Sequence, residues 1–218
     1  MKQAGKSRVM FIAAMMIFGT ISLFVRNIPL PTAEIAFWRA AVALAVIGVF
    51  MAATRRFGRL RDMRGKIWLY ALSGALMAFN WILLFEAIRY TTIALATLSY
   101  YVAPTLMVLA SVLFFRERLN VWQTLCFVLS TLGLVMMLRV SGGSGGDLKG
   151  ILLALASAVL YASVVMINKG AGETDGIART FVQFLAVVAV LAPFILLRGG
   201  FHLGQLGGRG LAALLAVG

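Results

Sequence analysis

The sequence predicts an all-α polytopic membrane helix bundle, with seven complete helices and the start of an eighth. Seven apolar stretches of about 20 residues each follow one another along the 218-residue chain, and 62% of its residues are hydrophobic. The hydrocarbon core of a bilayer is about 30 Å thick, so one helix needs about 20 apolar residues to cross it. A soluble domain of this length could not bury so large an apolar fraction. The predicted spans are Val9–Val25, Ala33–Ala53, Ile67–Ile88, Ile93–Phe115, Val121–Leu138, Leu148–Ile167 and Ile177–Leu197, and an eighth begins at Leu211.

Basic residues bound these spans in order along the chain. Arg26 follows the first span, the loop TRRFGRLRDMRGK the second, Arg89 the third, Arg116 and Arg118 the fourth, Arg139 the fifth, Lys169 the sixth and Arg198 the seventh. With a cytoplasmic N-terminus, 13 of the 20 Lys and Arg residues fall in inside segments and six in outside segments, with Arg39 inside a helix. Cytoplasmic loops carry an excess of Lys and Arg, so we expect this orientation in the cell inner membrane.

The formal net charge of +13 does not indicate a nucleic-acid partner. The charge is spread over the gaps between apolar spans and forms no basic domain, which excludes the usual electrostatic footprint of a nucleic-acid-binding protein. The partner that the sequence predicts is the lipid bilayer.

No cofactor or metal is expected either. The chain holds one cysteine, Cys126, and one histidine, His202, from which no metal cluster can be built. A membrane enzyme needs a converging set of acids, bases or metal ligands, and seven Asp plus Glu residues offer almost none. We therefore expect a protein that is not an enzyme.

The run SGGSGGD at residues 141–147 reads as a flexible linker that divides the chain. Five predicted helices precede it, so a second copy of the same unit would enter the membrane upside down, as in many transporters. When the sequence is aligned with itself at an offset of about 143 positions, Phe18 aligns with Tyr161 and Arg26 with Lys169, although sequence identity between the two halves is low. We predict a first repeat at 1–140 and a second, incomplete repeat at 148–218.

The segment Phe79–Leu119 resembles the third and fourth helices of the EamA family of the drug/metabolite transporter superfamily. The resemblance rests on the aromatic-Ala-Ile-x-Tyr-Thr junction at Phe85–Thr91, on Pro104 within the fourth span, and on Glu117 after it. Arg39, in the sequence FWRAAVALA, is similar to the arginine of the family's second helix.

This resemblance implies a carrier of ten helices in two inverted five-helix repeats, of which this chain holds the first repeat and part of the second. It also implies alternating-access transport of small organic metabolites such as amino acids, with export as the favoured direction. A homodimer is compatible with the family. The alternative is a membrane scaffold that transports nothing, or an inactive remnant of such a carrier.

Arg39 is the most informative polar residue within a predicted span. It lies about six residues below the outer end of its helix, and a guanidinium at that depth must be matched by a partner or a cavity. One reading is that Arg39 attracts an anionic substrate group. The other is that it is structural and pairs with helix ends or with Glu86.

The third span carries two further polar residues. Asn80 lies near its middle, where an unpaired amide is costly. Glu86 lies six residues further on, about 120° around the helix, so the two side chains do not point directly at one site. Glu86 either pairs with Arg89 at i+3, couples transport as a protonatable group, or tethers two helices.

Two spans carry polar stripes. In the fourth span the stripe consists of Thr97, Tyr101, Pro104 and Thr105, and in the sixth of Ser157, Tyr161 and Asn168. Pro104 frees a backbone carbonyl, which is tolerated at membrane depth where it lines a cavity or is buried in protein. We predict that the stripes face one central pathway, with Tyr101 and Tyr161 in a shared cavity. The alternative is that their hydroxyls and amide only join helices, as the small residues of the third span do.

Overall fold

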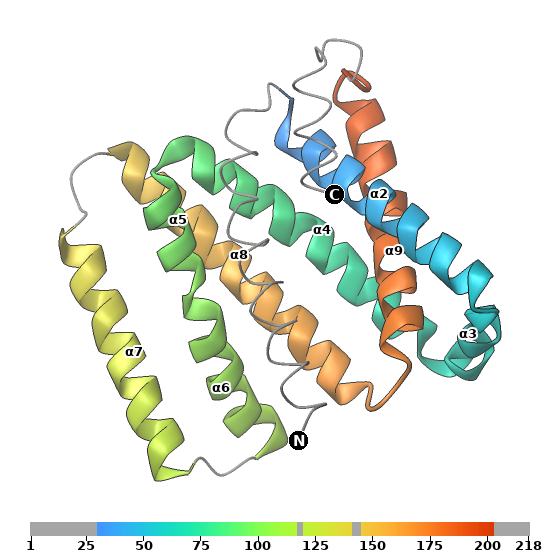
Figure 1. Cartoon of the computed structure of the whole chain (residues 1–218). Coiled ribbons are helices and arrows are strands. Elements are labelled where there is room, and N and C mark those ends of the chain that lie inside the picture. Colours follow the sequence, from blue (N-terminus) through green and yellow to red (C-terminus); the bar gives the residue numbers. More distant parts are fainter. Residues whose placement is uncertain (1–29, 117–119, 141–144, 203–218) are drawn as a thin grey trace.

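The computed structural model describes residues 30–116, 120–140 and 145–202, and these residues form helices joined by short turns (Figure 1). The helices are α2 (Thr32–Ala53), the short α3 (Arg59–Asp62), α4 (Ile67–Tyr90), α5 (Ile93–Tyr100), α6 (Val102–Phe115), α7 (Val121–Val140), α8 (Gly145–Gly170) and α9 (Gly176–Leu197). Two 3-10 turns, η1 (Arg56–Gly58) and η2 (Arg64–Lys66), flank α3. The predicted spans at Val9–Val25 and from Leu211 lie outside the described residues, as does Glu117.

The described part of the chain confirms the all-helical membrane fold. Five segments are long and apolar enough to cross a membrane: Thr32–Ala53, Arg64–Tyr90, Ile93–Phe115, Asp147–Gly170 and Gly176–Leu197. Large apolar side chains remain exposed on the outer flanks, as at Phe114, which is 74% exposed. Contiguous apolar surface of this kind fits a hydrocarbon solvent.

The helices lie side by side in the order α7, α5 with α6, α8, α4, α9 and α2 (Figure 1). The pairs α7 with α6, α8 with α4, and α9 with α2 run antiparallel, whereas α6 with α8 and α4 with α9 run parallel. Side-chain contacts pin the two ends of the central pair, α4 and α8. At one end the Lys66 Nζ donates to the carbonyl of Ala171 over 2.5 Å, and at the other the Thr91 hydroxyl lies 2.5 Å from Asp147 Oδ1. We call the end that holds the Arg55–Lys66 loop the basic end.

The fourth predicted span, Ile93–Phe115, is confirmed as a segment long and apolar enough to cross a membrane, but it is interrupted at Tyr101 and so consists of two helices, α5 and α6. Proline has no backbone N–H and its ring collides with the carbonyl four residues earlier, which for Pro104 is that of Tyr100. The helix therefore ends at Tyr100, and Pro104 stands in the first turn of α6, where a missing N–H costs nothing.

Two turns end or begin helices where the sequence supplies caps. Thr92 Oγ1 accepts the N–H of Leu95 at the start of α5, and Asp175 accepts the N–H groups of Ile177 and Ala178 at the start of α9. The helix α8 begins at Gly145, so the last three residues of the segment predicted as a linker at 141–147 are helical. The division into two repeats remains a prediction.

Close packing of α4 against α9 depends on Gly74. A Cβ built at Gly74 would lie 2.4 Å from the carbonyl oxygen of Gln183 and 2.8 Å from the Cβ of Ala186. Small residues allow membrane helices to approach in this way, where van der Waals contact replaces the hydrophobic effect as the driving force. A core of apolar side chains from α2, α4 and α9, including Ile35, Phe85 and Leu191, continues this contact.

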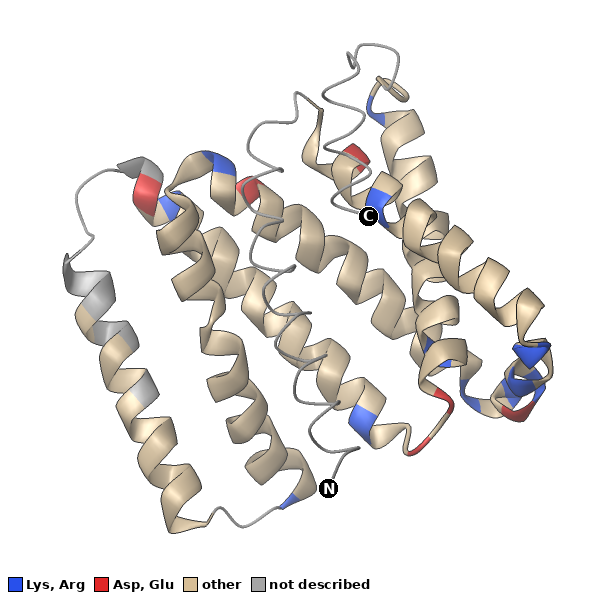
Figure 2. Ribbon diagram, in the orientation of Figure 1, with Lys and Arg blue, Asp and Glu red and all other residues tan. Residues whose placement is uncertain are grey.

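Charged residues gather at the ends of the helices (Figure 2). Six Lys and Arg residues lie between Arg55 and Lys66 around α3, against the single acid Asp62. Arg59 of this group lies 3.9 Å from Asp175, which caps α9. The charge pattern thus leaves an apolar band between two polar ends, as a membrane-spanning protein requires.

Candidate functional site

Asn80 and Ser157 meet in the interior of the bundle, each near the middle of its helix. The Ser157 hydroxyl donates to Asn80 Oδ1 over 2.7 Å and also lies 3.0 Å from the Asn80 backbone carbonyl. Both side chains are buried. This contact gives the buried amide oxygen the partner that it needs at membrane depth.

Tyr100 joins this pair from the last turn of α5. Its side chain lies close to that of Asn80 and interacts with it. Its ring centroid lies 5.7 Å from that of Tyr161 on α8, with the two rings inclined at 47°. Offset aromatic pairs at this separation attract through the positive edges and negative faces of the rings. The polar group of α4 is therefore linked to both α5 and α8.

Arg39 reaches the same place from α2. Its guanidinium carbon lies 4.6 Å from the centre of the Trp81 ring, in cation–π geometry, and its charge acts electrostatically on Tyr100. Trp81 is itself buried and follows Asn80 on α4. We call the set formed by Arg39, Asn80, Trp81, Tyr100, Ser157 and Tyr161 the central polar cluster.

The structure thus brings together four of the residues predicted from the sequence: Arg39, Asn80, Ser157 and Tyr161. The stripe predicted on the fourth span is placed differently. Tyr101 is 62% exposed and Pro104 is also exposed, whereas Thr97 and Thr105 are half-buried. It is Tyr100, one residue earlier, that contacts Tyr161. A sequence signal for Tyr100 did exist, because its carbonyl is the one that Pro104 leaves without a helical partner.

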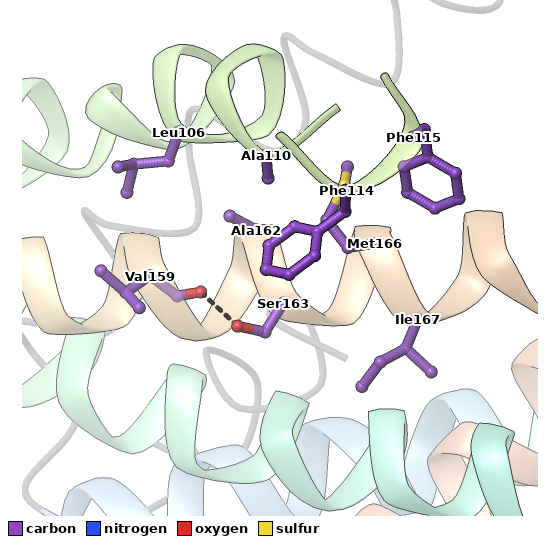
Figure 3. A pocket seen from close by; sticks show the side chains of 9 residues that line it. All are labelled: Leu106, Ala110, Phe114, Phe115, Val159, Ala162, Ser163, Met166 and Ile167. Atoms are coloured by element: carbon purple, nitrogen blue, oxygen red, sulfur yellow. Dashed lines mark hydrogen bonds between the residues drawn. The ribbon is translucent and has the colours of Figure 1, made fainter. Parts of the chain in front are cut away.

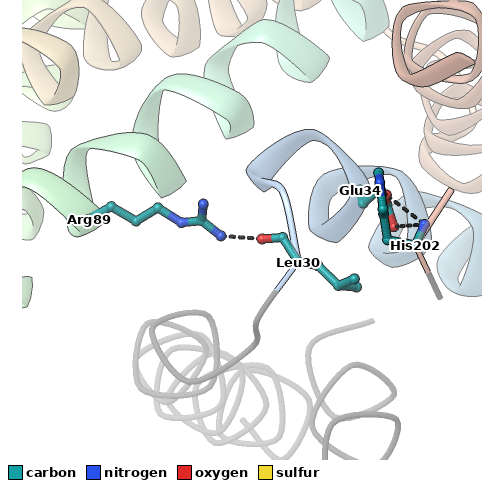
Figure 4. A network of polar contacts seen from close by, with 4 residues as sticks. All are labelled: Leu30, Glu34, Arg89 and His202. Carbon is teal, nitrogen blue, oxygen red and sulfur yellow. Dashed lines mark hydrogen bonds and ion pairs between the residues drawn. The ribbon is translucent and has the colours of Figure 1, made fainter. Parts of the chain in front are cut away.

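Glu86 lies apart from the central polar cluster. Its carboxylate accepts a hydrogen bond from the Thr32 hydroxyl over 3.1 Å, at the start of α2. Arg89, the partner expected from sequence, donates to the carbonyl of Leu30 (Figure 4). Both residues of α4 therefore hold the N-terminal turn of α2.

Sequence reasoning missed a buried carboxylate, that of Glu34, in the first turn of α2. Glu34 is fully buried, and His202 binds it twice (Figure 4). The backbone N–H of His202 lies 2.9 and 3.1 Å from the two carboxylate oxygens, and its ring Nδ1 lies 2.6 Å from Oε1. This contact ties the turn after α9 to the start of α2, which no local pattern in the sequence indicates.

A further buried network connects α4, α8 and α9 towards the basic end. The Gln183 amide donates to Ser73 Oγ over 2.8 Å and to Asn168 Oδ1 over 3.0 Å, and Tyr70 donates to Thr174 over 3.1 Å. Asn168, predicted as part of the stripe on the sixth span, thus joins helices here. Within the described ranges, no group of three His, Cys, Asp or Glu residues is placed to hold a metal ion.

The family of the chain follows from its sequence. A model of the EamA-like transporter family matches residues 6–139, more than half of the chain. The chain belongs to this family. Its central polar cluster therefore stands in the fold of an EamA-like protein. Four of the cluster's six residues lie within the matched segment: Arg39, Asn80, Trp81 and Tyr100.

Several relatives are themselves named as transporters. YxxF of Bacillus subtilis (strain 168), named as a transporter, is 27% identical over 197 residues, which cover 89% of this chain and 63% of YxxF. A transporter of Archaeoglobus fulgidus is 30% identical over 201 residues, covering 89% of this chain and 67% of the relative. The protein RarD of Salmonella typhi is 26% identical over 208 residues, covering 94% of this chain and 69% of RarD.

The same fold occurs in a solved crystal structure. It superimposes with a TM-score of 0.71 over 95% of this chain and 71% of the other, at 21% sequence identity. This similarity shows the fold alone. The EamA-like chain spans 63% of the length of YxxF and 69% of that of RarD.

Proposed function

We propose that the intact EamA-like protein exports a small amphiphilic metabolite, such as an amino acid, across the cell inner membrane by alternating access. The family and the names of its relatives support a transporter. The observation that carries the proposal further is Arg39, stacked on Trp81 beside Tyr100 and Asn80 among apolar helices. Ionisable side chains within membrane spans are costly and mark ligand pathways.

The chemistry of the central polar cluster suits a ligand with one anionic group and a modest apolar body. A guanidinium binds a carboxylate through two parallel N–H donors. The rings of Trp81, Tyr100 and Tyr161 offer apolar surface next to it, and the Asn80 amide offers a donor and an acceptor. Small-molecule sites commonly combine aromatic side chains with a few oriented polar groups of this kind.

Within this proposal Glu86 is the coupling group. Its carboxylate lies at the start of α2 against Thr32, whereas Glu34 is enclosed by His202 and serves the contact between α2 and the turn after α9. Movement of α2 relative to α4 would change the surroundings of Glu86. That relation supports a protonation step linked to the helix that carries Arg39.

Transport is tested in inside-out membrane vesicles that contain the intact protein. Uptake of radiolabelled amino acids into these vesicles corresponds to export. We expect uptake above that of vesicles lacking the protein, and loss of that excess in Arg39→Ala. Arg198→Ala is the matched control, because Arg198 stacks on Phe194 at the end of α9. Uptake equal to that of empty vesicles for a broad mixture of metabolites would favour the scaffold or the inactive remnant.

A further inference from the structure

A groove of about 510 Å³ runs between α6 and α8 (Figure 3). Its lining is almost entirely apolar and consists of Leu106, Ala110, Phe114, Phe115, Val159, Ala162, Ser163, Met166 and Ile167. The one hydroxyl among them, that of Ser163, donates to the carbonyl of Val159 over 2.9 Å within its own helix. The groove therefore offers an apolar surface to an occupant, and its one side-chain hydroxyl already has a hydrogen-bond partner.

The groove lies apart from the central polar cluster. Met166 of the groove follows Ser157 of the cluster by nine positions. At about 100° per residue they stand on opposite sides of α8. The groove is open on its outer side, where Phe114 is 74% exposed and Val159 is 51% exposed. Its occupant therefore arrives from the surroundings of the bundle.

The length of the groove matches one leaflet of a bilayer. On α6 it extends from Leu106 to Phe115, which is about 14 Å at helical rise. Half of a hydrocarbon core of about 30 Å is about 15 Å. An acyl chain of one leaflet fills such a groove, whereas a membrane-spanning helix of a partner would need contact over twice that length.

The end of the groove at the basic end carries positive charge. Lys169 Nζ lies 4.8 Å from the centre of the Phe115 ring and 3.2 Å from Ser111 Oγ. Lys169 stands two turns beyond Ala162 on the same face of α8. Arg116, which is exposed, follows Phe115 directly. Basic groups between membrane helices at the level of the headgroups attract anionic lipid.

We propose that the α6–α8 groove binds an acidic phospholipid from the leaflet at the basic end, with the acyl chain along Leu106 and Val159 and the phosphate beside Lys169. The apolar lining matches the chain, the one-leaflet length matches its reach, and the cation stands where the headgroup lies. This site is independent of the proposed transport function.

The test measures lipid retained by the intact protein. The protein is released from nanodiscs that hold equal amounts of phosphatidylglycerol and phosphatidylcholine, and bound lipid is counted by native mass spectrometry. We expect phosphatidylglycerol to exceed phosphatidylcholine about fivefold, the effect of one lysine at an acidic membrane surface. Lys169→Gln should bring the ratio close to one. Lys149→Gln, at the other end of α8 over the Tyr90 ring, should leave it unchanged.

A second pair of variants tests the groove itself. Ala110→Phe fills it and should reduce the retention of both lipids, whereas Leu113→Phe, outside the lining on the same helix, should not. Equal retention of the two lipids by the wild-type protein would overturn the proposal. So would an equal effect of Lys149→Gln and Lys169→Gln, or unchanged retention in Ala110→Phe. If the wild-type protein retains no lipid, a protein segment covers the groove and the proposal is wrong.

Discussion

The rings of Tyr100 and Tyr161 lie 5.7 Å apart and join the end of α5 to the middle of α8. The break in the fourth span makes this contact, because Pro104 ends α5 at the residue whose side chain reaches Asn80 and Tyr161. The adjacent Tyr101 is 62% exposed. One position in the chain thus separates a residue of the central polar cluster from one at the surface of the described bundle.

This difference between neighbours gives the first prediction. Tyr100→Phe keeps the ring contact with Tyr161 and removes the hydroxyl that interacts with Asn80. Loss of a polar interaction of about 1 kcal/mol should lower the initial rate of substrate uptake into inside-out vesicles about fivefold. Tyr101→Phe is the matched control and should transport as the wild-type protein does. The reverse order of the two variants would contradict the site.

Arg39 gives the second prediction. Arg39→Lys replaces a planar fork by a point charge, so a substrate carboxylate should bind about tenfold more weakly while the protein stays folded. Substrate affinity and thermal stability in detergent are measured together. If Arg39 is structural, Arg39→Ala should instead lower the melting temperature, because the groups around it lose their partner. A thermally normal Arg39→Ala protein with unaltered affinity would exclude both roles.

Gly74 gives a prediction about packing. Gly74→Ala places a methyl group 2.4 Å from the carbonyl of Gln183, so α4 and α9 must separate. Overpacking of this kind costs about 1–3 kcal/mol and should lower the melting temperature in detergent by several degrees. Gly48→Ala is the control, because its Cβ would meet only the Phe181 ring at 3.5 Å, an ordinary contact. Equal melting temperatures for both variants would show that α4 and α9 are not packed this closely.

Asp175 gives a prediction about pH. The N–H of Ala178, then that of Ile177 and the charge of Arg59, hold the pKa of this carboxyl below its usual value of 3.8. A carboxyl whose pKa is lower in the folded state stabilises the protein above its unfolded pKa and loses that effect as the pH falls through the folded pKa. The difference in melting temperature between the wild-type protein and Asp175→Ala should be full at neutral pH and shrink below about pH 4.

For that pair of proteins, melting is followed by circular dichroism across the acid range. Asp62→Ala, a change in the exposed helix α3, serves as the control and should show a smaller difference at every pH. A difference for Asp175→Ala that grows as the pH falls would contradict the assignment of Asp175 as a charged helix cap.

The orientation in the membrane gives the last prediction. We expect the Arg55–Lys66 loop on the cytoplasmic side, because basic residues concentrate there. With Cys126 replaced by Ser, Gly58→Cys has open space for its side chain. An impermeant maleimide added to intact cells should leave Gly58→Cys unlabelled and label Arg198→Cys at the opposite end. Labelling of Gly58→Cys in intact cells would reverse the orientation.

The sequence by itself was sufficient for the membrane class and for most helix bounds. Runs such as Ala33–Ala53 and Ile177–Leu197 differ by one residue from α2 and α9, because the thickness of the bilayer sets the length of an apolar run. The sequence was also sufficient to single out Arg39, Asn80, Ser157 and Tyr161 as polar residues of interest, since a polar side chain stands out within an apolar span. The structure brings these four residues together.

Only the tertiary structure decided which of these side chains meet. Ser157 reaches Asn80 across 77 positions of the chain, and Glu34 reaches His202 across 168. Local periodicity describes which face of a helix a residue occupies, but it does not determine which helix lies against that face. The sequence predicted that Tyr101 would lie beside Tyr161, whereas the structure places Tyr100 there, and the cause is the same. A proline within an apolar span interrupts the helix, and the final orientation of the two resulting helices depends on the neighbouring helices against which they pack.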